Sequence, residues 1–251
     1  MKIAALYDIH GNLPALNAVL NELDEVKPDI IVIGGDIVSG PMPVQTLQRL
    51  FALNATVHFI RGNGDREVVM AFNRQPLPKM SEKGREKTQW VAEQITQSQR
   101  DFLSELAQTV TLHVDGLGDV LFCHATPDSD EEIFTPLTPQ ERLSRIFSDI
   151  EQKIVVCGHT HMQFEREVGS VKIVNAGSLG MPFADEPGAY WLLIDRMGYE
   201  FRRTTYDFEV AAQEIRESKD PQGNEFAEGN VLKVPTAKAS AEFLERMAVK
   251  N

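Results

Sequence analysis

The chain has 251 residues, of which 42% are hydrophobic and 25% are charged, and its net charge is −12. This composition is that of an ordinary globular protein and excludes disorder as the main state of the chain. The excess of acidic residues argues against binding to long nucleic acids, whose phosphates are held by clustered lysine and arginine.

Short apolar runs rich in β-branched residues alternate with amphipathic stretches along the first part of the chain. The runs that predict buried strands are Ile3–Tyr7, Ile30–Ile33, Thr56–Ile60, Val120–Cys123, Ile154–Cys157, Val171–Val174 and Tyr190–Ile194. The stretches that predict helices are Leu13–Val26, Val44–Leu53 and Pro139–Glu151. This alternation predicts an α/β sheet whose first strands are parallel. The later strands, from Glu165 to Tyr206, follow without helices, which predicts an antiparallel meander.

Two segments depart from this alternation. Residues between Asp65 and Ala107 are polar and mostly helical, with a proline-rich break at Gln75–Lys79, and they predict a helical lid inserted at 66–108. The residues from Lys219 to Asn230 are rich in Gly, Asn, Pro and acidic residues and predict a loop. Ala237–Lys250 predicts a last helix that packs back or exchanges with a neighbouring subunit. We therefore expect a single domain over 1–251, with a loop and C-terminal helix at 219–251, and a homo-oligomer is an open alternative.

The N-terminus and the cysteines predict a cytoplasmic protein. Asp8 and His10 interrupt the start of the chain too early for a secretory signal, which needs ~7–15 apolar residues. No apolar run approaches the ~20 residues of a membrane span, so no membrane partner is expected. The two cysteines, Cys123 and Cys157, are too few for a disulfide framework and suit a reducing compartment as buried free thiols.

A polar cluster follows each of five predicted strands. Together the clusters hold two carboxylates, one amide and four of the six histidines, namely Asp8, His10, Asp36, Asn63, His124, His159 and His161. Ligand sites in open α/β sheets gather outside the carboxyl ends of strands, so we expect these side chains to converge. Oxygen and nitrogen donors without thiolate suit divalent Mn, Fe, Zn, Ni or Co. Seven donors are too many for one tetrahedral ion and suit two ions that share a carboxylate.

Taken in chain order, these motifs resemble those of the calcineurin-like metallophosphoesterase superfamily. The motifs are D-x-H at Asp8, G-D at Asp36, G-N-x-D at Asn63, a histidine after an apolar strand at His124, and G-H-T-H from Gly158 to His161. The turn Asn175-Ala-Gly-Ser178 resembles the Asn-Pro-Gly-Ser turn of small bacterial and archaeal members. The resemblance covers most of the chain, although the lid and the last helix carry no motif.

The resemblance implies a four-layer αββα sandwich of two mixed sheets, with a dinuclear metal centre at the edge of the two sheets. Carried over by position, one ion would be bound by Asp8, His10, Asp36 and His161. The other would be bound by Asp36, Asn63, His124 and His159, with Asp36 bridging both. A hydroxide that bridges the ions would attack phosphorus in line, so no protein nucleophile is expected.

The chain departs from the family pattern at Gly64, where much of the superfamily has a histidine that protonates the leaving group. General acid catalysis typically contributes ~10²–10⁴-fold. We therefore expect poor hydrolysis of unactivated monoesters and preference for phosphodiesters or phosphoanhydrides. Asp65 normally orients the missing histidine, so its role in this chain is open.

Several neighbouring polar residues are weaker candidates. Asn12 and Thr160 could orient metal ligands, and Arg61 could contact phosphate or pair with a carboxylate. His58 and His113 lie in strand patterns outside any motif and are expected to be structural.

The function expected from the sequence is that of a metal-dependent phosphoesterase acting on a small phosphorylated substrate, through phosphodiester or nucleotide phosphoanhydride bonds such as those of dinucleoside polyphosphates. One alternative is a protein Ser/Thr phosphatase, which Gly64 disfavours. The other is a noncatalytic metal-binding scaffold that works by protein contacts, as the retromer scaffold subunit of this fold does.

Overall fold

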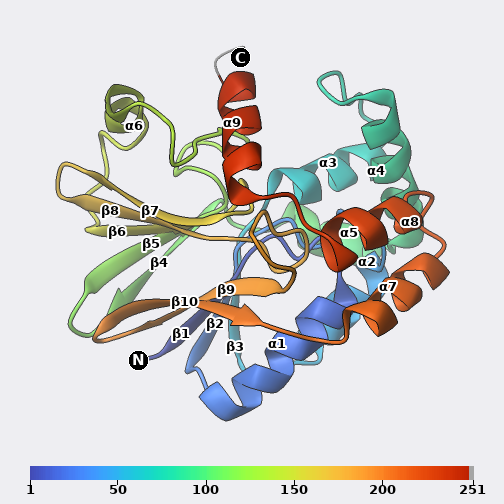
Figure 1. The fold of residues 1–251 in the computed structure, drawn as a ribbon, viewed down its shortest axis with the longest axis horizontal. Helices are drawn as coiled ribbons and strands as arrows, with labels where there is room; N and C mark the ends of the chain where they lie inside the picture. The colour runs from blue at the N-terminus through green and yellow to red at the C-terminus, as the bar shows by residue number, and fades with distance from the viewer. Residues whose placement is uncertain (249–251) are drawn as a thin grey trace.

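The computed structural model of the chain describes residues 1–248, which form two five-stranded sheets with helices on their outer sides (Figure 1). The first sheet has the order β10 (Gly198–Thr204), β9 (Ala189–Asp195), β1 (Ile3–Leu6), β2 (Ile30–Ile33) and β3 (Thr56–Phe59). The second has the order β4 (Thr109–Val114), β5 (Gly118–Cys123), β6 (Ile154–Cys157), β8 (Val171–Ala176) and β7 (Gln163–Val168).

The central strands are apolar throughout because both of their faces are buried. Along β1, Ile3 and Ala5 face the second sheet and pack in one cluster with Phe122 of β5. Ala4 and Leu6 face the opposite way and pack against the helices over the first sheet. Since successive side chains of a strand point to opposite faces, these two clusters place the first sheet between a helical layer and the second sheet.

Helices complete the outer layers on both sides of the sandwich. The first sheet is covered by α1 (Leu13–Val26), α2 (Pro43–Phe51), α3 (Asn63–Phe72), α4 (Glu82–Gln94) and α5 (Gln97–Ser104). The second sheet is covered by α6 (Gln140–Ile146) and α9 (Ala237–Ala248). A separate small cluster joins α7 (Phe208–Glu217), α8 (Gly223–Phe226) and the π-helix η1 (Ala227–Leu232). The expected αββα sandwich is therefore confirmed.

The parallel pairing of the first strands is confirmed, because β1 pairs in parallel with β2 and β2 with β3. The strand β4 is present in the structure but was not predicted from the sequence. Its sequence TVTLHV alternates polar and apolar residues, and it is a partly exposed edge strand rather than a fully buried one. His113 of β4 is exposed, and its Nδ1 lies 2.8 Å from Asp119 Oδ1.

The predicted meander from Glu165 to Tyr206 is wrong as a single unit. β7–β8 and β9–β10 are two separate antiparallel hairpins, and they belong to different sheets. β8 pairs in parallel with β6, whereas β9 pairs with β1. The connection between the hairpins crosses from one sheet to the other at the end of β1, where Leu179 N donates to Tyr7 O at 2.9 Å and Gly180 N donates to Asp8 O at 2.9 Å.

The predicted loop from Lys219 to Asn230 is also corrected, because most of it is helical in α8 and η1. The helical turns form because Phe226, Ala227 and Val231 are buried against α7, a tertiary contact that the polar composition conceals. The last predicted helix is present as α9, and the predicted residues after Ala248 lie outside the described part of the chain.

The segment predicted as a lid contains most of α3 and all of α4 and α5. Its buried side chains, Val91, Ala92 and Leu103, belong to the core cluster over the first sheet. A parallel bridge between Ile60 and Ala107 closes the base of the segment. A role as a lid stays a prediction. Within residues 1–248, no helix has both the length and the apolar character that a membrane span requires.

Candidate metal centre

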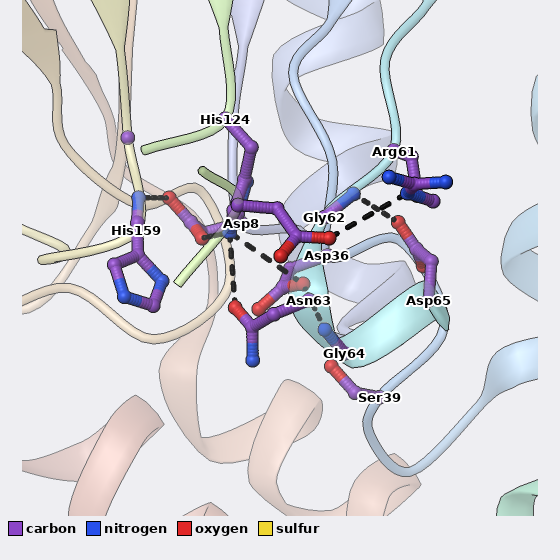
Figure 2. Close-up of polar contacts among 12 residues, drawn as sticks. Asp8, Asp36, Ser39, Arg61, Gly62, Asn63, Gly64, Asp65, His124 and His159 are labelled. Atoms are coloured by element: carbon purple, nitrogen blue, oxygen red, sulfur yellow. Dashed lines mark hydrogen bonds and ion pairs between the residues drawn. The ribbon is translucent and has the colours of Figure 1, made fainter. Parts of the chain in front are cut away.

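The loops after β1, β2, β5 and β6 and the start of α3 meet at one edge of the two sheets (Figure 2). They bring together all seven side chains that the sequence singled out. Two overlapping groups could each hold an ion, Asp8 with His10 and His161, and Asp8 with Asp36 and His124. In each group the ligand atoms lie within 4.8 Å of one another.

The first group is built around two imidazoles that face each other. The Nε2 atoms of His10 and His161 are 3.0 Å apart, and Asp8 Oδ1 lies 3.5 Å from His161 Nε2 and 3.9 Å from His10 Nε2. The carbonyl and hydroxyl of Ser39 lie 3.3 and 2.8 Å from His10 Nδ1. Since a carbonyl only accepts, this contact favours a proton on Nδ1 and leaves the Nε2 lone pair directed into the centre.

The second group places His124 between two oxygen donors. His124 Nε2 lies 3.6 Å from Asp36 Oδ1 and 3.3 Å from Asn63 Oδ1, while its Nδ1 donates to the carbonyl of Gly34 at 2.8 Å. The ring of His159 lies 5.2 Å from the His124 ring. The hydrogen bond to Gly34 fixes the tautomer that presents the Nε2 lone pair to an ion.

Both carboxylates face both groups. Asp36 Oδ2 lies 3.6 Å from His10 Nε2, and Asp36 Oδ1 lies 3.6 Å from His124 Nε2. Asp8 Oδ1 lies 3.9 Å from the same two nitrogens. The bridging position assigned to Asp36 therefore has a geometric basis, and it stays a prediction.

An unpartnered oxygen at the centre shows that the residues fit a cation. Asp8 Oδ1 is fully buried and has no hydrogen-bond partner among the described residues, although Asp8 Oδ2 accepts from the His159 backbone N–H at 2.9 Å. A buried carboxylate oxygen without a partner is costly. Imidazole lone pairs and carboxylate oxygens pointing at one space are the donor set that divalent metals require.

The backbone at the centre is held in an unfavourable conformation. Among residues 1–248, eight non-glycine residues have positive φ, and five of them are candidate ligands: Asp8, His10, Asp36, His159 and His161, with φ between 49° and 66°. Such residues cost of order 1–3 kcal/mol each and persist only where the surrounding structure imposes them. These residues follow β1, β2 and β6. The concentration of backbone strain there indicates that the fold tolerates unfavourable φ angles in order to position the ligand side chains.

Burial and mutual charge set the protonation of the carboxyl groups. Burial raises the pKa of Asp36 to about 6. Burial together with the charge of Asp36 raises the pKa of Asp65 to about 7. Burial acts in the same direction on Asp8, but its interactions with His161, His124 and His10 outweigh burial and hold the pKa of Asp8 below its usual range.

Burial and neighbouring charges shift the pKa values of the histidines in two directions. Burial lowers the pKa of His159 to about 3 and holds the pKa of His10 well below its usual value. Burial also opposes the charged form of His124, yet the charges of Asp36 and Asp8 raise its pKa above the usual value. His10 and His159 are therefore neutral near pH 7, which is the form that binds metal.

Residues behind the ligands fasten the loops to one another. Asn12 caps α1 by accepting from Ala15 N at 3.2 Å, and its amide donates to Gly180 O at 3.0 Å. Asn175 donates to Thr160 Oγ1 at 3.0 Å and to Gly158 O at 2.6 Å. Thr160 and Asn12 thus contact the loops that carry ligands, and their role in orienting the ligands stays a prediction.

Ser178 also links two segments at the centre. Its hydroxyl donates to the Asp8 carbonyl at 2.8 Å and accepts from Met181 N at 2.8 Å. The connection between the two sheets is thereby fixed to the end of β1.

Arg61 lies at the rim of the centre and faces a carboxylate. Its Nε is 3.5 Å from Asp130 Oδ2, and Arg66 makes a bidentate contact with the same carboxylate at 2.8 and 2.9 Å. Arg61 thus pairs with a carboxylate, and its contact with phosphate stays a prediction. Cys123 and Cys157 are buried in the outer cluster over the second sheet and are not ligand candidates.

Two functional features were not predicted from the sequence. Asp65 has a clear role, because its carboxylate accepts from the backbone N–H groups of Ile37, Val38 and Gly62 at 2.8, 3.2 and 3.1 Å. Ser39, which contacts His10, lies three residues beyond Asp36 in the same polar cluster. Its position in that cluster was the only available sequence signal.

Comparison with known proteins agrees with this geometry. The model of the calcineurin-like phosphoesterase superfamily domain matches residues 1–196. The chain belongs to this superfamily. It is 27% identical to protein MJ0912 of Methanocaldococcus jannaschii over 238 residues, covering 88% of this chain and 94% of that protein. It is 24% identical to the phosphodiesterase YfcE of Escherichia coli over 202 residues, covering 77% of this chain and 87% of that protein.

Solved structures show the same fold. The PH1004 protein of Pyrococcus horikoshii superimposes with a TM-score of 0.75 at 22% identity, covering 90% of this chain and 97% of that one. A metallophosphoesterase of Sphaerobacter thermophilus superimposes with a TM-score of 0.69 at 23% identity, covering 92% of this chain and 98% of that one. Membership in the calcineurin-like superfamily confirms the prediction of a metal-dependent phosphoester hydrolase.

Proposed function

We propose that this calcineurin-like phosphoesterase uses two divalent ions to hydrolyse phosphodiester or nucleotide phosphoanhydride bonds, such as those of dinucleoside polyphosphates. The observation that carries the proposal is the pair of overlapping ligand groups around Asp8 Oδ1, a buried oxygen without a hydrogen-bond partner in the described part of the chain. Two groups that share a carboxylate suit a dinuclear site better than a single ion.

In this proposal, Asp8, His10, Asp36 and His161 hold one ion, and Asp36, Asn63, His124 and His159 hold the other. When bound, the ions would supply the lowered pKa of a water molecule and the positive charge that stabilises the phosphoryl transition state. Mn, Fe, Zn, Ni and Co all suit these donors.

The chain's own residues set the orientation of the donors. The Gly34 carbonyl holds the proton of His124 on Nδ1, and Ser39 does the same for His10. Of these two, His10 is neutral near pH 7 and presents its Nε2 lone pair without first losing a proton. The carboxylates of Asp8 and Asp36 offset the charge that the ions bring into the buried centre.

The position after Asn63 favours diesters over monoesters. Gly64 offers no side chain to protonate a leaving group, so a leaving group of low pKa is favoured. The alternative of a protein Ser/Thr phosphatase is disfavoured for the same reason. A noncatalytic metal-binding scaffold would bind metal but hydrolyse no phosphoester.

The test is hydrolysis of bis(p-nitrophenyl) phosphate by metal-stripped protein before and after addition of Mn²⁺. We expect turnover only with metal, and loss of that activity in Asp36→Asn. Absence of turnover together with absence of a metal-dependent rise in melting temperature would refute the enzymatic proposal.

A further inference from the structure

A cavity of about 490 Å³ adjoins the metal centre, and its wall includes His161, one of the candidate ligands. Phe183 and Tyr190 line the same cavity, which we call the His161 cavity. On the side of the centre, His161 Nε2 lies 3.0 Å from His10 Nε2 and 3.5 Å from Asp8 Oδ1. One imidazole is therefore shared by the cavity and the first ligand group. A phosphoester whose phosphorus lies at the centre has room for a substituent in this cavity, because sites for small molecules typically measure ~300–1,000 Å³.

Phe183 is fixed against this imidazole. Its backbone N–H donates to the His161 carbonyl at 2.9 Å, and the centres of the two rings are 5.1 Å apart with an angle of 38° between their planes. The Phe183 ring is half-buried and also packs against the cluster over the second sheet. A group bound against this ring would lie next to a candidate metal ligand.

Tyr190 supplies a second aromatic side chain that is held at both ends. Its backbone N–H donates to the Ser178 carbonyl at 3.1 Å, and its hydroxyl donates to the Glu186 carbonyl at 2.8 Å. The ring is half-buried, as is that of Phe183. Aromatic side chains that are fixed but still accessible are the surfaces on which planar rings, including nucleobases, stack.

The charged groups of the cavity wall are carboxylates. Asp185 is exposed and forms no ion pair among residues 1–248, whereas Glu186 pairs with Arg203 at 2.5 Å. No lysine or arginine is among the described residues that line the cavity. Phosphate groups are bound by cations and N–H donors, and carboxylates repel them. The cavity therefore suits an uncharged substituent and not a further phosphate group.

We propose that the His161 cavity binds the uncharged aromatic group of the phosphoester, which in a nucleotide substrate is the nucleobase, against Phe183 and Tyr190. This inference rests on the proposed phosphoesterase function and names its substrate class. The preferred substrate carries a nucleoside or an aryl group on the phosphate at the metal centre, and a polyphosphate chain without a base is a poor substrate.

The first experiment compares two ligands that differ only in the base. Mn²⁺-loaded protein is titrated calorimetrically with adenosine 5′-monophosphate and with ribose 5-phosphate. We expect the nucleotide to bind roughly 5- to 100-fold more tightly, the range for stacking of one base on an aromatic side chain. Equal affinities for the two ligands would overturn the proposal.

Variants then separate stacking from a purely structural role of the aromatic rings. Phe183→Leu and Tyr190→Leu should each reduce the preference for the nucleotide by at least about threefold. Tyr190→Phe, which keeps the ring but loses the bond to Glu186, and Phe51→Leu, at an exposed position on α2, should keep the full preference. If the leucine variants lose affinity for both ligands equally, the rings only support His161 and the proposal is wrong.

A charged ring tests the role of the carboxylates. Phenylphosphonate and 4-carboxyphenylphosphonate cannot be hydrolysed and differ by one negative charge on the ring. We expect the added charge to weaken binding about two- to fivefold, the range for a single exposed charge interaction, and Asp185→Asn to reduce this penalty. A charged ring that binds as well as the uncharged one would overturn the proposal, because the cavity would then accept an anion.

Turnover of bis(p-nitrophenyl) phosphate distinguishes the two levels of the proposal. Wild-type protein that prefers the nucleotide through Phe183 and Tyr190 but hydrolyses no phosphoester would refute the proposed function and not the aromatic site. Turnover without any preference for the base would refute the aromatic site alone.

Discussion

The hydroxyl of Ser39 lies 2.8 Å from Nδ1 of His10, on the side of the imidazole that faces away from the metal centre. The same hydroxyl fills the space beside Gly64, because a Cβ built on Gly64 would lie 2.6 Å from Ser39 Oγ. One side chain thus orients a metal ligand and occupies the place next to the residue that departs from the family pattern. Figure 2 shows Ser39 next to Gly64.

Ser39→Ala should weaken metal binding while leaving the fold intact. Loss of a partner behind a metal-ligating histidine typically costs 10–100-fold in affinity. We expect about tenfold, the lower end of that range, because the Ser39 carbonyl remains 3.3 Å from His10 Nδ1. Calorimetric titration with Mn²⁺ measures the change, and Ser148→Ala at an exposed position is the control. An unchanged affinity would show that His10 is oriented without the hydroxyl.

Gly64→His tests the leaving-group argument, but it needs a second change to be informative. The new Cβ would lie 2.6 Å from Ser39 Oγ and 2.9 Å from both Ser39 Cβ and Asp36 Oδ1. We therefore expect the single variant to lose metal affinity and activity. In Ser39→Gly/Gly64→His both contacts with Ser39 are removed and only the approach to Asp36 Oδ1 remains. The ratio of monoesterase to diesterase activity should rise above that of Ser39→Gly alone. A ratio that does not rise would contradict the assignment of diester preference to Gly64.

The sequence predicted the convergence of the seven candidate ligands because each follows or begins a regular element at the same edge of a sheet. Parallel strands place their carboxyl ends together, so Asp8 and Asp36 had to be neighbours once β1 and β2 were paired. His124 and His159 follow β5 and β6, which form the corresponding edge of the second sheet. Local patterns were sufficient for these residues.

The remaining features depend on contacts between segments that no local pattern encodes. The two late hairpins belong to different sheets because β9 pairs with β1, more than 180 residues away. The helical turns of α8 and η1 form on the buried face of α7 in spite of their polar composition. Likewise, Lys87 of α4 comes within 3.9 Å of Asp220 only because α4 packs against the α8 region.

Asp65 should be important for stability rather than for chemistry. Its carboxylate joins the loop after β2 to the start of α3 by accepting from three buried backbone N–H groups. Asp65→Ala leaves these groups unpaired, and an unsatisfied buried donor costs ≈1–3 kcal/mol. We expect the free energy of unfolding to fall by at least about 3 kcal/mol in Asp65→Ala and by less in Asp65→Asn, which keeps one acceptor oxygen.

Urea denaturation of metal-free protein measures this difference, and Asp149→Ala, in an exposed loop, is the control. A loss in Asp65→Ala no larger than that of the control would show that the three N–H groups find other partners. If stability were unchanged but activity were lost, Asp65 would instead act in the chemistry.

Metal removal should destabilise the protein through Asp8. A ligand at a hundredfold its Kd stabilises the folded state by ≈2.7 kcal/mol, which corresponds to about 5–11 °C in melting temperature for a chain of this size. We expect Mn²⁺ to produce a rise of this order in wild-type protein and a chelator to abolish it. Asp8→Asn should remove most of the rise, because Asp8 Oδ1 is the only carboxylate oxygen of the described residues that belongs to both ligand groups and lacks a hydrogen-bond partner. Asp24→Asn, on the exposed face of α1, should keep the full rise. An Asp8→Asn variant that responds to Mn²⁺ as wild type does would place the ions elsewhere.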